Sequence, residues 1–539
     1  MTVTDMPIEP DVLIVGAGIA GGMVADVLAS AGRSVVLLES GPRLERDRLV
    51  ETWRRTARTD YMAPYPQPDH APVPDPNDWG NYLIQTGPDP YHQQFIRGVG
   101  GTTWHWAAAT WRFLPNDFRI NTLYGVGRDW PIGYDDLEPY YLRAETLMGV
   151  AGIPGDGIAP RSAPYPMDGI PLSYMDQVIA ERLNPHGYMM ETEPVARNNR
   201  VYDGRPPCCG NNNCMPICPI GAQYSGNLAV EKAERAGAQV ITEAVASFIE
   251  RDDANRVTAV RYLKPDGSEW RVRARMFVLA ANGIETPRLM LLSAGPGAEN
   301  GLANSSDMVG RNLMDHPGTS VSFEMPMPVW PGRGPQENTS ILRFRDGEFR
   351  RDMSAKKLHL WNGSAVAGVT DEAIEEGLTG DALREAVKYR TARRCAINNF
   401  HEQTADPNNR LTLSPDQMDP LGLPRPSIHY RIDEYVQQSA RHTAEVYRDI
   451  VDKLGARLIS VGDGSEGFAP NNHIMGGTIM GDDPGNSVVD GTCRTHDHDN
   501  LYIASSSVFA SGACVNSTLT IAALSLRMGA HIEERLRGG

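Results

Sequence analysis

The segment DVLIVGAGIAGG, residues 11–22, constrains the fold more than any other part of the chain. Its apolar run predicts a buried strand, and Gly16, Gly18 and Gly21 form the pattern G-x-G-x-x-G at the start of an amphipathic helix. The first glycine permits a tight turn, the second lets the backbone approach a pyrophosphate, and the third permits close helix–strand packing. A second apolar strand at 34–40 follows, so the sequence predicts an α/β fold with a parallel sheet.

An acidic residue supports the same interpretation. Glu39 stands at the end of the second strand, where a carboxylate can accept hydrogen bonds from ribose hydroxyls. The strand, the helix and this carboxylate together predict a dinucleotide site. The pattern itself does not distinguish FAD from NAD, and a glycine-rich turn without a ligand is the alternative.

The composition excludes some classes of protein. The chain has 539 residues, enough for two or three domains, and its net charge of −16 argues against a nucleic-acid-binding protein with a basic face. We expect no membrane-spanning helix, because no run of about 18 apolar residues is present. The first residues carry acids where a signal peptide has a positive region, so we expect synthesis and folding in the cytoplasm without a signal peptide.

Other segments differ in regularity. Residues 60–92 are rich in Pro, Asp, Tyr and Asn, and we expect them to wrap over a surface rather than build a core; 154–168 and 324–336 are similarly irregular. The clearer segments are, as strands, 275–282, 409–415 and 427–433, and, as helices, 286–295, 370–394, 433–454 and 519–536.

Four of the seven cysteines lie in the segment CCGNNNCMPICP. Cys208, Cys214 and Cys218 follow the spacing C-x5-C-x3-C, with Cys209 as a fourth thiol and Pro219 after the last cysteine. Structural zinc sites usually combine two separated pairs of ligands, and no second pair is present. Iron–sulfur proteins concentrate thiolates in one short segment, so this centre is favoured, while a disulfide pair and zinc remain open.

The two motifs together favour one cofactor. A one-electron iron–sulfur centre needs a partner that releases electrons singly, which a flavin does and a nicotinamide does not. The sequence therefore predicts FAD, in a flavodehydrogenase that passes electrons out of the protein.

Four further motifs resemble those of the glucose–methanol–choline (GMC) oxidoreductases, over nearly the whole chain. They are GVGGTTWHW (98–106), VLAANGIETPRLMLLSAG (278–295), VGRNLMDHPG (309–318) and NLYIASSSVFASGACVNSTLTIAALSLR (500–527). With the cysteine cluster, the chain is most similar to catalytic subunits of bacterial FAD-dependent glucose dehydrogenases. It is less similar to the large subunits of gluconate, sorbitol and fructose dehydrogenases.

The resemblance implies a fold and a division of the chain. The fold is a Rossmann-like FAD-binding domain with a substrate-binding domain on a mostly antiparallel sheet with helices. The expected segments are 1–165 as the first part of the FAD-binding domain, 166–225 as a connection with the iron–sulfur loop 208–219, 226–304 as the second FAD-binding part, 305–470 as the substrate-binding domain, and 471–539 as the C-terminal FAD-binding part with the active-site residues.

The resemblance also implies site residues. Cys208, Cys214 and Cys218 would hold a three-iron, four-sulfur (3Fe-4S) cluster, with Cys209 not a ligand. His473 would take the substrate proton and Asn516 would orient the same hydroxyl, because an imidazole is poised near neutral pH for this task. The expected flavin contacts are Gly100, Gly101, Thr103, His105 and Val245, the last near the adenine.

Some side chains keep two interpretations. His105 is expected as a non-covalent contact of the flavin, with a covalent bond to FAD as the alternative. His316, in the DHPG turn, is expected to be structural. Trp330 and Trp361 are candidates for stacking on a sugar or for the core.

The implied activity is oxidation of a sugar hydroxyl, first of all glucose at C1, by hydride transfer to FAD. The alternatives are gluconate, sorbitol, fructose or glucoside-3-dehydrogenase activity, and then an oxidase or lyase of the same family. The implied partners are a small accessory subunit with a twin-arginine signal and a membrane-bound multihaem cytochrome c. These would hold the chain at the periplasmic side of the inner membrane.

Overall fold

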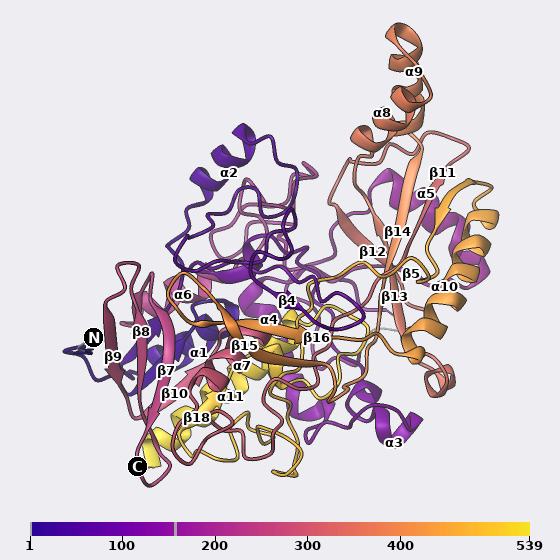
Figure 1. Ribbon diagram of the computed structural model, residues 1–539. Coiled ribbons are helices and arrows are strands. Elements are labelled where there is room, and N and C mark those ends of the chain that lie inside the picture. Colours follow the sequence, from indigo (N-terminus) through magenta and orange to yellow (C-terminus); the bar gives the residue numbers. More distant parts are fainter. Residues whose placement is uncertain (1–2, 156–158, 539) are drawn as a thin grey trace.

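The computed structural model (Figure 1) describes residues 3–155 and 159–538. It contains the predicted strand–helix–strand unit. Strand β2 (Val12–Val15) leads through the glycines into helix α1 (Ile19–Ser30), and β3 (Val35–Leu38) lies parallel to β2. All side chains of both strands are buried, as in the centre of a sheet that is covered on both faces. The expected segments 1–165 and 471–539 and the irregular stretch 154–168 include residues 1–2, 156–158 and 539, which lie outside the described residues.

This unit belongs to a five-stranded parallel sheet with the order β18-β10-β2-β3-β6. The added strands are β6 (Gln239–Ile241), β10 (Met276–Leu279) and β18 (Leu501–Ile503). Helix α1 packs against α6 (Asn227–Arg235) and α11 (Thr518–Gly538). The chain leaves β2 towards β3 on one side, whereas β10 pairs with β2 on the other, and a crevice for a ligand forms where the strand order reverses.

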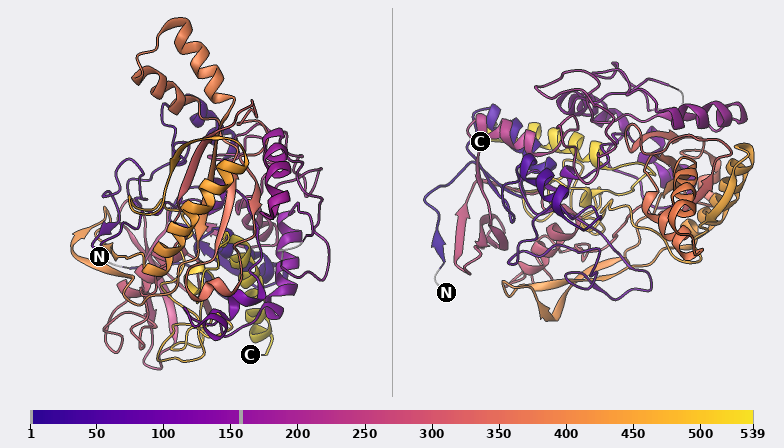
Figure 2. Two further views of the ribbon diagram at one scale, coloured as in Figure 1. Left: turned by 90° about the vertical axis from the view of Figure 1, so that its right-hand side faces the viewer. Right: turned by 90° about the horizontal axis from the view of Figure 1, so that it is seen from above.

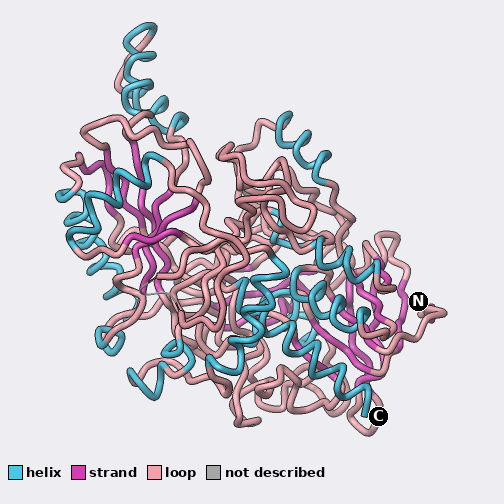
Figure 3. Tube along the Cα trace, turned by 180° about the vertical axis from the view of Figure 1, so that it is seen from behind, coloured by secondary structure: helices cyan, strands magenta, loops and turns pink. Residues whose placement is uncertain are grey.

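A second, antiparallel sheet forms the other lobe, as predicted (Figure 3). Its order is β17-β11-β14-β13-β12-β5, with β5 (Met190–Thr192), β11 (Ser320–Glu324), β12 (Glu337–Ile341), β13 (Lys356–Trp361), β14 (Arg394–His401) and β17 (Arg457–Val461). Helices α5 (Tyr174–Leu183) and α10 (Glu434–Lys453) cover one face (Figure 2).

Strand alternation gives the two faces of this sheet different chemistry. Leu358 and Leu360 of β13 and Ile397 of β14 pack under the helices. The alternate residues of β13, Lys357, His359 and Trp361, lie on the opposite face, towards the parallel sheet. The six-stranded sheet therefore presents polar and aromatic groups to the space between the lobes.

Two smaller sheets complete the fold. One has the order β1-β9-β8-β7, formed by β1 (Thr4–Asp5), β7 (Val245–Arg251), β8 (Val257–Leu263) and β9 (Glu269–Arg273). The other has the order β15-β16-β4, formed by β4 (Ile84–Gln85), β15 (Arg410–Met418) and β16 (Pro424–His429). The remaining helices include α2 (Arg46–Arg55), α3 (Ile120–Tyr124), α4 (Tyr134–Met148) and α7 (Asn282–Leu292).

The structure corrects two expectations. Residues 60–92 are irregular apart from β4, but they do build a core, because Met62, Tyr65, Tyr82 and Tyr91 are buried in a shared apolar cluster. Their aromatic side chains supply apolar area although the backbone forms no regular element. The single helix predicted at 370–394 is instead a pair, α8 (Val366–Glu375) and α9 (Gly380–Thr391), which projects from the lobe (Figure 1).

Two glycines explain why the helical pattern at 370–394 forms two helices. Gly377 and Gly380 have φ of 79° and 56°, left-handed values that end one helix and allow a turn before the next. The expected domain boundaries stay a prediction. Strand β5, from the expected connection 166–225, pairs with β12 of the expected substrate-binding domain.

We expect Gly21→Ala to lower the free energy of unfolding by about 1–3 kcal/mol, because its Cβ would lie 2.0 Å from the carbonyl oxygen of Gly16. Gly368→Ala in α8 is the matched control, since a Cβ there meets nothing within 4 Å. It should stabilise the protein by about 0.5–1 kcal/mol through the higher helix propensity of alanine. Urea unfolding followed by circular dichroism measures both. Equal effects of the two changes would contradict the close approach of α1 to β2.

Candidate active site

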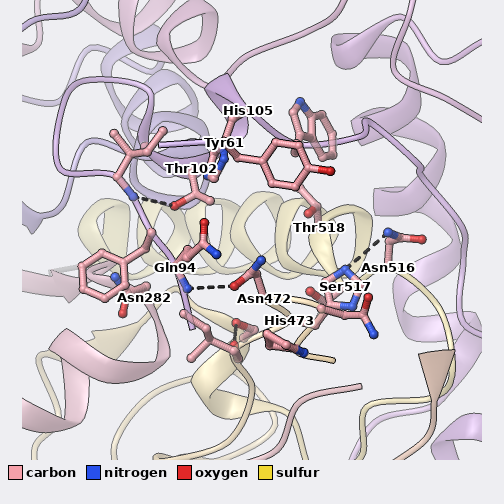
Figure 4. Close-up of a pocket in the computed structure, with 18 of the residues that line it drawn as sticks. Tyr61, Gln94, Thr102, His105, Asn282, Asn472, His473, Asn516, Ser517 and Thr518 are labelled. Atoms are coloured by element: carbon pink, nitrogen blue, oxygen red, sulfur yellow. Dashed lines mark hydrogen bonds between the residues drawn. The ribbon is translucent and has the colours of Figure 1, made fainter. Parts of the chain in front are cut away.

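A cavity of about 1400 Å³ lies between the two lobes (Figure 4). It begins at the glycine-rich turn after β2, and its wall includes the polar face of the six-stranded sheet and the segment 461–474. Most of the residues predicted from the sequence line it: Gly16, Gly18, Glu39, Gly101, Thr103, His105, Val245, His473 and Asn516.

At the end of the cavity next to β2, glycines expose the backbone because they carry no side chain. Gly16 has a φ of 106°, and a Cβ on it would lie 2.4 Å from the carbonyl oxygen of Ala280. A Cβ on Gly101 would lie 3.1 Å from the Cα of Gly18. Gly100 does not line the cavity but fixes this arrangement, since its N–H donates to the carbonyl of Ala17 at 2.8 Å. Side chains would fill this cradle, so its shape fits a pyrophosphate held by backbone.

Glu39 is buried beside the glycines and is held by main-chain donors. Its Oε2 accepts a hydrogen bond from the N–H of Ala17 at 3.0 Å, and its Oε1 accepts one from Gly41 at 2.9 Å. Each carboxylate oxygen keeps lone pairs for further donors. The carboxylate therefore lies at the end of the second strand, on the cavity wall, where the sequence predicts contact with a ribose.

At the other end, two distant segments pair and carry the histidines. Met314 and Gly318 form bridges with Met475 and Ala469, respectively. Asp315 strengthens the pairing, because its Oδ1 accepts a hydrogen bond from the backbone N–H of His473 at 2.9 Å. This pairing brings the DHPG turn against His473.

His473 has polar neighbours on both ring nitrogens, and Figure 4 shows one of them, Asn516. Its Nδ1 is 2.7 Å from Nδ1 of His316, and its Nε2 is 3.3 Å from Nδ2 of Asn516. Nε2 of His316 lies 2.9 Å from the carbonyl oxygen of Ala513 and 3.2 Å from that of Gly512. His316, expected as a structural turn residue, thus contacts the predicted catalytic histidine directly.

Burial keeps these imidazoles neutral. It lowers the pKa of His473 well below its ordinary value, and the neighbouring His316 adds to the effect. Burial likewise lowers the pKa of His316 and of His105 to about 4. Neither ring nitrogen of the buried His105 has a hydrogen-bond partner, so this side chain has free polar atoms at the cavity wall.

A buried ionic cluster beside Asn516 escaped the sequence analysis. Lys357 on β13 lies 2.6 Å from Oε1 of Glu193 and 3.5 Å from Oε1 of Glu337, and all three side chains are buried. The Nζ of Lys357 also donates to Oδ1 of Asn516 at 3.1 Å. The alternation of the strand KKLHLW could have indicated that Lys357, His359 and Trp361 share a face.

Comparison with known proteins gives this geometry a context. Models of the GMC oxidoreductase family match residues 182–318 and 405–525. The large subunit of fructose dehydrogenase from Gluconobacter japonicus is 48% identical to the chain over 99% of both proteins. The chain belongs to the GMC oxidoreductase family.

One further relative and one solved structure are also similar to the chain over nearly its whole length. The 2-methyl-1,2-propanediol dehydrogenase of Mycolicibacterium austroafricanum is 26% identical over 98% of this chain and 96% of its own. The crystal structure of pyridoxine 4-oxidase from Mesorbium loti, 18% identical, covers 97% of this chain and 98% of its own with a TM-score of 0.65, which supports the same fold.

FAD is the cofactor of this GMC oxidoreductase, and the residues present fit it. The glycine cradle suits the pyrophosphate, and Glu39 suits the ribose. Val245 lines the cavity at the start of β7, where the sequence predicts the adenine. Trp361 lines the cavity, whereas Trp330 is 46% exposed and does not.

The cysteine loop reaches the cavity through Met215, which lines it. Its four cysteines are free thiols: Cys214 and Cys218 are buried, and Cys209 is exposed. Burial raises the pKa of Cys208, and the neighbouring Cys214 and Cys218 add to the rise. Among the described residues, no three His, Cys, Asp or Glu side chains converge to hold a single metal ion.

Proposed function

We propose that this GMC oxidoreductase is the flavin-bearing large subunit of a sugar dehydrogenase. The observation that carries the proposal is a buried, neutral His473 whose Nε2 lies beside the amide of Asn516 at the wall of the cofactor cavity. The 48% identical relative acts, by its name, on fructose, so fructose is the first candidate substrate. Glucose, expected from the sequence, is the second.

The chain's own residues supply the acid–base part of the reaction. FAD, when bound, accepts the hydride from the carbon that carries the hydroxyl. His473 Nε2 accepts the hydroxyl proton as the hydride leaves, since a neutral imidazole is a suitable base. The Nδ2 of Asn516 lies next to this nitrogen and orients the same hydroxyl. Trp361 and Asn398 line the cavity from the six-stranded sheet and offer a stacking face and a polar group to a sugar.

The electrons would leave through a 3Fe-4S cluster on Cys208, Cys214 and Cys218. The support for this proposal is the spacing of three cysteines in one short segment, which iron–sulfur proteins use to bring thiolates to different irons of one cluster. Gly210 N–H points at Sγ of Cys208 at 3.4 Å, a donor of the kind that tunes such centres.

The loop also touches the cofactor cavity. Met215, next to Cys214, lines the cavity. The side-chain amide of Gln223 donates to the carbonyl of Trp106 on the cavity wall and, at 3.4 Å, to that of Cys214. These contacts support a short path from the flavin to the cysteines.

The name "large subunit" in the 48% identical relative supports an assembly with other subunits. We propose that a small accessory subunit with a twin-arginine signal and a multihaem cytochrome c hold the chain at the periplasmic side of the inner membrane. In the described part of the chain, no helix is both long and apolar enough to cross a bilayer.

Dye-linked oxidation of fructose, glucose, gluconate, sorbitol and a glucoside, with product analysis, tests the activity. We expect oxidation of at least one of them, and a loss of kcat by about 10²–10⁴-fold in His473→Asn. His429→Asn, at an exposed position, is the control and should keep full activity. Peroxide formation matching sugar consumption would show an oxidase instead, and full activity of His473→Asn would refute the proposed base.

The buried His473 also predicts a pH dependence. A base acts in its neutral form, and the lowered pKa of His473 keeps it neutral below the usual imidazole value of 6.5. We therefore expect kcat/KM to stay constant as the pH falls through 6.5 and to decline only at lower pH. An acid limb at or above 6.5 for the reaction would contradict this environment.

Iron and acid-labile sulfide counts test the cluster. We expect about three irons per chain in the wild type and a clear loss of iron in Cys208→Ser. Cys209→Ser is the matched control. Cys209 is the exposed cysteine next to Cys208 and is not a proposed ligand, so its replacement should leave the iron content unchanged. One zinc per chain, or equal iron loss in both variants, would overturn the assignment.

A further inference from the structure

His473 lies inside a chain of hydrogen-bonding groups whose two ends have fixed roles. At the first end are the carbonyl oxygens of Gly512 and Ala513, 3.2 and 2.9 Å from Nε2 of His316. Carbonyl oxygens only accept, so Nε2 of His316 must carry a hydrogen. Because burial lowers the pKa of His316 to about 4, the ring is neutral and its Nδ1 is an acceptor.

This end determines the hydrogen on His473. The Nδ1 atoms of the two rings are 2.7 Å apart. Since that of His316 accepts, that of His473 must donate, and His473 carries its hydrogen on Nδ1. Its Nε2 is then without a hydrogen and faces Asn516.

The second end gives the same answer independently. An ammonium group only donates, so Oδ1 of Asn516, 3.1 Å from Nζ of Lys357, accepts from it. The NH₂ group of Asn516 is thereby turned towards Nε2 of His473, 3.3 Å away, and needs an acceptor there. Glu193, at 2.6 Å, holds Lys357 in place, and the Nζ lies 4.7 Å from the ring centre of Phe400.

We propose that His316 and Lys357 are positioning residues that fix, from opposite sides, the Nδ1–H tautomer of His473 and so keep Nε2 open as the proton acceptor. The inference rests on the proposed function. In the reaction, the substrate O–H bond breaks and an Nε2–H bond forms on His473. The C–H bond breaks as well, and its hydride would go to FAD. The hydrogen on Nδ1 of His473 stays bonded to that nitrogen throughout and is donated to Nδ1 of His316.

Other charged groups surround this chain of contacts. The titratable and charged groups facing His473 are His316 and Asp315 from the DHPG turn and Lys357 and His359 from β13, with Glu193 and Glu337 behind Lys357. His359 is neutral, because burial lowers its pKa to about 3.

The first test replaces His316 in the FAD-loaded enzyme. His316→Phe keeps a ring against Phe400 but removes the acceptor, and we expect kcat to fall about 100-fold with little change in KM. His316→Asn retains an oxygen near the position of Nδ1 and should recover most of this loss. A merely structural role would make the two variants equal, or would make activity follow FAD content and melting temperature; either result overturns the proposal.

Imidazole ¹⁵N shifts of the labelled enzyme report the tautomer directly. The signals of His473 are identified by their absence in His473→Asn. We expect a protonated Nδ1 and a bare Nε2 in the wild type and in His316→Asn, and a mixture of tautomers in His316→Phe. A wild-type Nε2–H signal would refute the inference.

The second test concerns Lys357. Lys357→Met should lower kcat about 10-fold by freeing the amide of Asn516, and Lys357→Gln, which keeps an N–H donor, should recover it. Lys356→Met is the matched control: this lysine is also buried on β13 but contacts Ser439 and His442 on the opposite face, and its loss should leave kcat unchanged. If Lys357→Met destabilises the fold by leaving Glu193 unpaired, the comparison of Lys357→Gln with wild type by ¹⁵N shifts still decides, since a changed tautomer there contradicts the donor role.

The outcomes separate this inference from the proposed function. An active His473→Asn enzyme removes the proposed function itself. An inactive His473→Asn enzyme with fully active His316→Phe and Lys357→Met removes only the inference.

Discussion

The contact between Gly21 of α1 and the carbonyl of Gly16 after β2 is the constraint on which the structure depends. It lets the helix lie directly on the strand, with a Cβ excluded by a 2.0 Å approach. The helix N-terminus then faces the crevice at the carboxyl ends of β2 and β10, where the strand order reverses, and the positive end of the helix dipole favours phosphate there. The cofactor end of the cavity, including Glu39, follows from this geometry.

The active-site end depends on a different constraint, the pairing of the segments 314–318 and 469–475. Asp315 is its polar centre: besides binding the N–H of His473, it accepts from the N–H of Asn471 at 3.0 Å and from Gln93 at 2.8 Å. The carboxylate thus ties three separate segments together. The same packing buries His316 and His473. Burial lowers the pKa of both imidazoles and keeps them neutral, so each ring has one nitrogen that donates and one that accepts.

The proposed catalytic base and the proposed route of electron exit share one cavity. Residues 106 and 215 line the cavity, while Gln223 joins the first of these to the cysteine loop. His473, the proposed base, and Met215, the neighbour of Cys214, both line the cavity in which a flavin would bind. A dehydrogenase with such a centre needs a flavin between the two, because the substrate delivers two electrons together and an iron–sulfur centre accepts them singly.

The sequence by itself determined the strand–helix–strand unit and the long helix α10, because both depend on local periodicity or on a motif. Motifs also singled out His473 and Asn516, which line the cavity and whose catalytic roles stay a prediction. It failed for residues 60–92, whose core is made by aromatic side chains without a regular backbone, and for 370–394, where two glycines divide a helical pattern. Only the tertiary structure decided the hydrogen-bond partners of His473 and Asn516. His316 is 157 residues from His473, and Lys357 is 159 residues from Asn516. Such contacts are made by pairing of distant segments and by burial, which no local pattern records.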